Sequence, residues 1–221
     1  NAEKVIKKLF TEMLGGSDPV IIGDTVHIGM DEYPDEYKTQ METYCNNIIA
    51  HVNSLGYKAR IWSGVGKDGG CLYGATLKGD FEVNFWAKNL SGISETMALN
   101  CGVINTINNL LYVVPSTNYN FVDYYDLEKL YSKWQVNTVD YNGTKLCEAN
   151  DSRLLGASFA IWNDIHTAYF GLTYRDVIDR LRGMICLLAE KNWCGTDTAS
   201  KISTANFMAR YNKLSVRAGD A

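Results

Sequence analysis

The sequence of 221 residues predicts an α/β fold, and within that class a partial (β/α)8 TIM barrel of about five βα units, from the fourth strand onward. Two observations predict it. Short segments rich in β-branched and aromatic residues alternate with segments of helical hydrophobic spacing, which is typical of parallel βα units. Acidic and aromatic residues fall at or just past the strand ends, and in a barrel these positions gather on one face. An open five-stranded sheet is the alternative.

The first elements are a helix, a strand and a longer helix. Hydrophobic residues recur at helical spacing from Val5 to Met13, until Gly15 and Gly16 end the pattern. The segment Thr25–Met30 is a short strand that ends at two adjacent acids. A second helix extends from Asp35 to about Leu55.

Four further strands complete the prediction. They are Lys58–Ser63, Phe81–Ala87, Gly102–Thr106 and Ala157–Trp162. The expected helical segments are Ser94–Asn100, Val122–Gln135 and Tyr174–Lys191. Apolar residues near Ile21 and in Leu110–Val114 lie too close to their neighbours to form separate crossover units. We expect residues 1–221 to be one incomplete domain, the C-terminal portion of a catalytic barrel.

Composition excludes several classes of protein. With 46% hydrophobic residues the chain can bury a core. It has 21 basic and 25 acidic residues, a net charge of -4 and no long basic run, so we expect no nucleic-acid partner. No apolar run approaches the roughly 20 residues of a membrane helix, so no membrane partner is expected. The 6 cysteines form no C-x-x-C pair, which indicates neither zinc nor a redox motif and leaves a disulfide open.

The acid pair Asp31-Glu32 is either a solvated turn or the working end of an active site. Neighbours in an extended segment point to opposite faces, so these two side chains are not expected to flank a substrate as facing carboxylates. A division of labour is the better hypothesis: Glu32 donates a proton to a leaving oxygen while Asp31 holds another group by hydrogen bond. The nucleophile must then come from elsewhere.

The segment HIGMDE resembles the H-x-G-G-D-E motif of glycoside hydrolase family 20, the β-N-acetylhexosaminidases and their relatives. This family is an exception to the two-carboxylate scheme of most glycosidases, because its substrate supplies the nucleophile. The resemblance implies that Glu32 is the general acid and base and that Asp31 orients the 2-acetamido group of the substrate. His27 takes the position of the motif histidine, a supporting residue. No metal and no organic cofactor are implied.

The resemblance continues in spaced aromatic residues. Trp62 and Trp86 match tryptophans that wall the pocket for the N-acetyl group, and Tyr112 matches the tyrosine that bonds the acetamido oxygen. Trp162 and Asp164 match a tryptophan and an acidic residue that hold sugar hydroxyls. Without the acid pair, packing in the core would be the better interpretation of these tryptophans.

Departures from the motif indicate a branch. Met30 stands where the motif has glycine, Val114 where the pattern has aspartate, and Asp164 where many exo-acting members have glutamate. The combination of INTINNLLYVVP and WND looks most like lacto-N-biosidase, which implies a glycan substrate, release of the disaccharide lacto-N-biose, and action outside the cell.

Other functions stay open. One is an exo-β-N-acetylhexosaminidase. Another is a carbohydrate-binding module, or a fragment that is inactive because residues on the first three strands of the family's barrel are absent from this chain. An uncovered sheet edge also favours self-association, so we expect a homodimer or pairing with the N-terminal part of the barrel.

Overall fold

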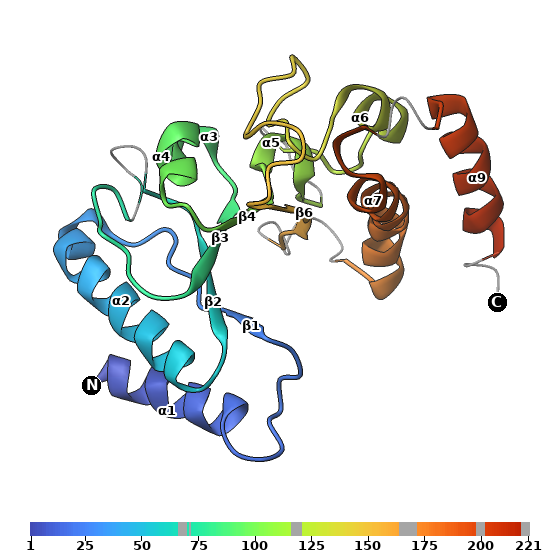
Figure 1. Cartoon of the computed structure of the whole chain (residues 1–221). Helices are drawn as coiled ribbons and strands as arrows, with labels where there is room; N and C mark the ends of the chain where they lie inside the picture. Colours follow the sequence, from blue (N-terminus) through green and yellow to red (C-terminus); the bar gives the residue numbers. More distant parts are fainter. Residues whose placement is uncertain (66–69, 71, 116–120, 164–171, 198–201, 218–221) are drawn as a thin grey trace. The chain divides into compact units, whose positions relative to one another are not determined.

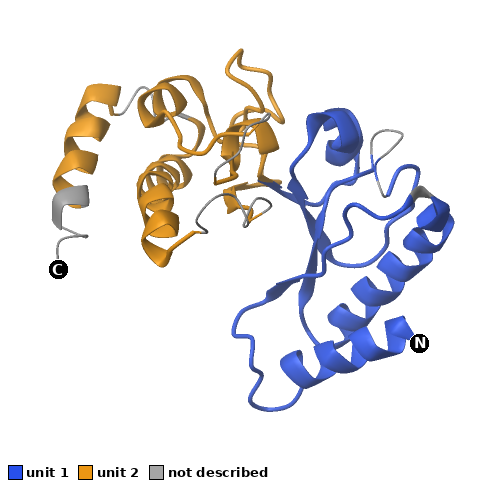
Figure 2. Cartoon of the chain, turned by 180° about the vertical axis from the view of Figure 1, so that it is seen from behind, with its two compact units in different colours: residues 1–104 blue, residues 105–221 orange. Residues whose placement is uncertain are grey.

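The computed structural model describes residues 1–65, 70, 72–115, 121–163, 172–197 and 202–217. The chain forms two compact units, residues 1–104 and 105–221 (Figure 2). The boundary falls within strand β4 (Gly102–Asn105). The main sheet has the order β1-β2-β3-β4-β6, so strands follow one another in space as they do in sequence. The predicted α/β fold with a five-stranded sheet is confirmed.

The first unit contains most of this sheet and the helices that cover it (Figure 1). Its elements are α1 (Ala2–Leu14), β1 (Thr25–His27), η1 (Asp35–Tyr37), α2 (Lys38–Ser54), β2 (Lys58–Trp62), β3 (Phe81–Phe85), α3 (Lys88–Ser91), α4 (Ile93–Ala98) and most of β4. Helix α2 packs against β2, and α1 packs against α2. The three helices predicted for this region, Ser94–Asn100 included, are therefore present.

The two faces of this sheet differ in polarity because side chains alternate along each strand. In the parallel register Val26 lies beside Ala59, and Ala59 beside Phe81, and all three are buried. Helix α2 supplies the apolar side chains that pack with this face: Met41, Cys45, Ile48, Ile49 and Val52. Polar residues of the same strands therefore point to the opposite face.

The second unit combines short strands with three packed helices. Its elements are α5 (Asn108–Leu111), β5 (Tyr112–Val113), α6 (Leu127–Lys133), β6 (Leu154–Ala157), β7 (Ala160–Ile161), α7 (Tyr174–Cys194), η2 (Gly195–Asp197) and α9 (Thr204–Arg217). The ring of Tyr131 in α6 stacks on Phe207 in α9, with centroids 4.1 Å apart. Lys191 in α7 is fully buried, and its Nζ donates to Trp134 O at 2.8 Å. These contacts join the three helices.

Two predicted strands differ in detail. The segment 157–162 is not one strand, because β6 belongs to the main sheet whereas β7 pairs with β5 in a separate two-stranded sheet. Asn192 from α7 bonds both the N–H and the C=O of Ala157, at 2.8 and 2.9 Å, which ends β6 there. Leu110–Val114, for which we predict no separate crossover unit, contains the two-residue strand β5. The strand from Thr25 is shorter than predicted and ends at His27.

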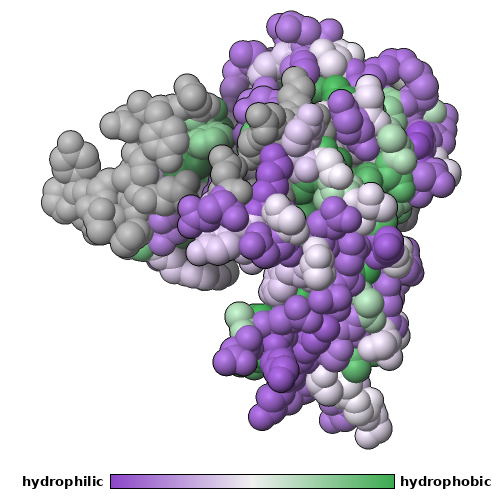
Figure 3. All heavy atoms as spheres, turned by 90° about the vertical axis from the view of Figure 1, so that its left-hand side faces the viewer, coloured by the Kyte–Doolittle hydropathy of each residue, from purple (hydrophilic) through white to green (hydrophobic). Residues whose placement is uncertain are grey.

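Hydrophilic residues cover most of the coloured surface on the side that carries α2 in Figure 1, and hydrophobic residues appear there only in patches (Figure 3). Within the parts of the chain that the structure describes, no helix combines the length and the apolar character needed to cross a bilayer.

Candidate active site

The acid pair lies on a strained turn directly after β1. Gly29, Met30 and Glu32 have φ angles of 80°, 82° and 50°. A left-handed backbone costs a residue other than glycine roughly 1–2 kcal/mol, so the turn is held against strain at two positions. The expectation that Asp31 and Glu32 continue an extended segment is wrong, because β1 ends before them. Met30 adopts a conformation that glycine, the motif residue at this position, adopts without cost.

A small pocket lies at this turn, at the carboxyl ends of β1, β2 and β3. It has a volume of about 30 Å³, which is room for about two water-sized groups. Its lining consists of Met30, Asp31, Glu32, Ser63, Gly64, Gly70, Trp86 and Leu90. Asp31 is half-buried and Glu32 is exposed. Burial raises the pKa of the Asp31 carboxyl above its ordinary value, and a hydrogen bond from its own backbone N–H opposes this effect.

Three predicted aromatic side chains gather beside the acids, one from each of three neighbouring strand ends. The rings of His27 and Trp62 are 5.0 Å apart between centroids. Trp62 meets Trp86 edge to face at 6.5 Å. Parallel strands bring their carboxyl ends to one edge of the sheet, which explains why residues far apart in sequence meet here.

The backbone carbonyl of Ser63 holds Trp86, buried hydroxyl groups surround that contact, and no sequence pattern predicts them. The indole Nε1 of Trp86 donates to Ser63 O at 2.5 Å, and Ser91 Oγ donates to the same oxygen at 3.1 Å. The hydroxyls of Ser63 and Thr96 are 2.9 Å apart. All three hydroxyl residues are buried. A serine after a strand carries no pattern that separates it from an ordinary loop residue.

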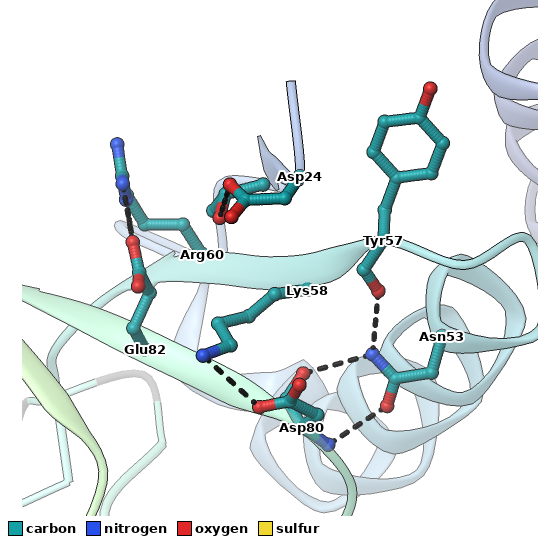
Figure 4. A network of polar contacts seen from close by, with 8 residues as sticks. Asp24, Asn53, Tyr57, Lys58, Arg60, Asp80 and Glu82 are labelled. Carbon is teal, nitrogen blue, oxygen red and sulfur yellow. Dashed lines mark hydrogen bonds and ion pairs between the residues drawn. The ribbon is translucent and has the colours of Figure 1, made fainter.

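An ion pair next to His27 was also missed. Arg60 of β2 donates through Nε to Glu82 Oε1 of β3 at 2.5 Å, and its Nη2 contacts the same oxygen (Figure 4). Glu82 is 4% exposed, so its charge is neutralised within the protein. The sequence signal for this ion pair is the period-2 alternation in KARIW and FEVNF, because it places Arg60 and Glu82 on the same polar face of the sheet.

His27 is neutral near pH 7. Desolvation by the surrounding protein, and then the positive charge of Arg60, lower its pKa to about 4, although the residue keeps access to solvent. Its Nδ1 accepts the N–H of Gly29 at 3.0 Å. His27 therefore contacts the backbone of the acid turn directly.

The remaining predicted site residues belong to the second unit. The parallel pairing of β5 with β7 brings Tyr112 and Trp162 together, with ring centroids 5.5 Å apart. The ring centroid of Phe121 lies 5.9 Å from that of Tyr112. Asp164 lies outside the described residues. The structure thus contains two clusters, the acid pair with His27 and two tryptophans in one unit, and Tyr112 with Trp162 in the other.

Metal ions have no evident site in the described residues, where no three histidine, cysteine, aspartate or glutamate side chains form a group suited to bind one.

Comparison with known proteins gives matches among solved structures. No family model matches the sequence, and no curated protein does. Dispersin B is similar with a TM-score of 0.65 at 20% identity, over 86% of this chain and 58% of that protein. The exo-β-N-acetylglucosaminidase of family 20 from Vibrio harveyi has a TM-score of 0.64 at 16% identity, over 95% of this chain and 33% of that one. The β-hexosaminidase of Streptomyces plicatus has a TM-score of 0.60 at 17% identity, over 95% and 38%.

These identities are low, so the likeness concerns the fold. The chain spans 58% of Dispersin B and about a third of the Vibrio harveyi enzyme. It has the α/β fold of part of the TIM barrel of these glycoside hydrolases.

Proposed function

We propose that this chain belongs to a glycoside hydrolase that cleaves β-linked N-acetylhexosamine glycans by substrate-assisted, retaining catalysis, and that it releases lacto-N-biose. The observation that carries the proposal is the pocket that joins Asp31, Glu32 and Trp86 at the carboxyl edge of the sheet. Its volume of about 30 Å³ has room for the methyl end of an acetamido group and is too small for a sugar ring. The family 20 exo-β-N-acetylglucosaminidases among the structures of similar fold agree with this class of substrate.

Each acid has a separate role in the proposed reaction. Asp31 accepts a hydrogen bond from the acetamido N–H and directs the carbonyl oxygen toward the anomeric carbon. That oxygen attacks, the glycosidic bond breaks, and Glu32 gives its proton to the leaving oxygen. Water then attacks the anomeric carbon of the cyclic intermediate from the side opposite the acetamido oxygen and loses a proton to Glu32. The bond between the acetamido oxygen and the anomeric carbon breaks, which restores the acetamido group with net retention of configuration.

One position favours the disaccharide over a single sugar as the product. Val114 stands where the pattern of the family has a carboxylate that holds the hydroxyls of a terminal sugar. Glycans of this kind are extracellular, and we propose that location for the enzyme.

The first experiment compares the hydrolysis of chromogenic β-glycosides of lacto-N-biose and of GlcNAc. We expect faster cleavage of the lacto-N-biose glycoside, and a loss of roughly 10²- to 10⁴-fold in kcat for Glu32→Gln, since a positioned proton donor contributes about this much. Glu36→Gln is the matched control, because Glu36 is an exposed acid four positions along the same connection. Preference for the GlcNAc glycoside would favour the exo-hexosaminidase, and no cleavage of either substrate by a parent protein with the complete barrel would overturn the proposal.

A second experiment tests the nucleophile. Fluorine atoms on the acetyl methyl group withdraw electrons from the carbonyl oxygen and weaken it as a nucleophile. A substrate-assisted enzyme therefore slows with each added fluorine, whereas an enzyme with its own carboxylate nucleophile does not. Equal rates for the acetyl and trifluoroacetyl substrates would exclude the mechanism.

A further inference from the structure

The turn with the acid pair needs something that holds it in its strained conformation. Two backbone hydrogen bonds tie its beginning to β2: Ile28 N–H donates to Arg60 O at 2.8 Å, and Trp62 N–H donates to Gly29 O at 2.9 Å. Both precede the two non-glycine residues of positive φ, Met30 and Glu32. A side-chain contact adds to them, because Gly29 N–H donates to His27 Nδ1 at 3.0 Å.

The contact with Gly29 determines the tautomer of His27. A ring nitrogen that accepts a hydrogen bond carries no proton, so the neutral ring holds its proton on Nε2. In the imidazolium form both ring nitrogens bear protons, and Nδ1–H would face the N–H of Gly29. The hydrogen bond therefore exists only while the ring is neutral.

Desolvation is the main cause that lowers the pKa of His27, and the positive charge of Arg60 on the next strand adds to it. In the parallel register His27 lies beside Arg60, and Arg60 lies beside Glu82, so the three form a row across β1, β2 and β3. Glu82 binds Arg60 through Nε and Nη2 and holds its guanidinium in this row (Figure 4). Asp31 is a further acidic group, on the turn itself, with its Oδ1 3.9 Å from the place where a Cβ on Gly29 would stand.

We propose that His27 is a positioning residue: as the Nε2–H tautomer it accepts the Gly29 N–H at Nδ1 and so fixes the turn that presents Asp31 and Glu32. Its catalytic consequence rests on the proposed function. Its structural content, the tautomer and the hydrogen bond, does not.

Two substitutions at one position separate the roles of the ring nitrogens. His27→Asn puts an amide oxygen close to the place of Nδ1, so the acceptor for Gly29 is kept. His27→Gln puts the amide near the place of Nε2, and the acceptor is lost. We expect His27→Asn to retain most of kcat and His27→Gln to lose about 100-fold with little change in KM, because a small misplacement of a catalytic group costs on this order. Equal losses in both variants would overturn the proposal.

Two further measurements need no turnover. The ¹⁵N spectrum of the chain labelled at its 3 histidines, assigned by the signal lost in His27→Asn, should show a protonated Nε2 and a bare Nδ1 at neutral pH. Hydrogen exchange of the Gly29 amide should be faster in His27→Gln than in His27→Asn. A protonated Nδ1, or equal exchange in both variants, would refute the positioning role. If these signatures appear while no glycoside is cleaved, the proposed function fails and the structural content stands.

Discussion

Replacement of Met30 by glycine and by alanine tests the backbone strain at the acid turn. Met30 is 4% exposed, so either change removes a buried side chain, at a cost of about 2–5 kcal/mol for alanine. The informative quantity is the difference between the two variants. In the alanine variant the φ of 82° still costs roughly 1–2 kcal/mol of stability. In the glycine variant this cost is absent, but the unfolded chain is more flexible, which lowers the free energy of unfolding by about 0.5–1 kcal/mol. We expect Met30→Gly to be more stable than Met30→Ala by about 0.5–1 kcal/mol.

Urea unfolding followed by circular dichroism measures this difference. With an m-value of about 2–3 kcal/mol/M, the midpoints of the two variants should differ by roughly 0.2–0.5 M. Met41 in α2 provides the control, because it is 2% exposed and lies in regular helix. There alanine should be the more stable by about 1 kcal/mol. The same order of stability at both positions would refute the left-handed conformation of Met30.

Three further changes test burial and close packing. Asp31→Asn should raise the free energy of unfolding near pH 7 but not well below pH 3.8. Burial raises the pKa of the Asp31 carboxyl in the folded protein above 3.8, so the ionised carboxylate destabilises the fold as pH rises through that pKa. Identical urea curves for the variant and the original protein at both pH values would contradict this prediction. Burial lowers the pKa of Lys191 from 10.5 to about 8, so between pH 8 and pH 10.5 the unfolded chain binds more protons than the folded protein. The free energy of unfolding should therefore rise with pH across this window, and Lys191→Met should weaken that rise. An unchanged slope in the variant would exclude a lowered pKa of Lys191. Gly70→Ala should lower the melting temperature by roughly 2–10 °C. The Cβ of alanine would meet Gly64 O and approach Leu90 O to 2.8 Å, and backbone oxygens do not move aside as side chains do. An unchanged melting temperature would show that the contacts around Gly70 are less tight than this.

Hydrophobic periodicity was sufficient to predict the long elements. Helix α2 and helix α7 have apolar stripes long enough to distinguish them from strands, and both occur where they were expected. Short elements were harder, because β5 and β7 have two residues each and their pairing depends on tertiary contacts. No periodic run indicates where a strand such as β6 changes partners, and α9 was not predicted at all.

At the candidate site, the sequence indicated which residues to examine but not their geometry. The motif around Asp31 and Glu32 is contiguous, so a local pattern was enough to find it. The left-handed turn was hidden, because methionine at position 30 gives no sign of a positive φ as a glycine would. Ser63 and Glu82 act through contacts with residues distant in sequence, and a single amino-acid sequence does not show such contacts.

The polar face of the sheet constrains what can cover it. Its charges are already satisfied within the layer, since Arg60 is paired with Glu82, and Lys58 Nζ lies 3.5 Å from Asp80 Oδ1 (Figure 4). A hydrophobic helix designed to cap this face would remove water from two ion pairs and offer them no hydrogen bond in return. A designer who wished to stabilise this unit alone would therefore choose a cap rich in asparagine, glutamine and serine.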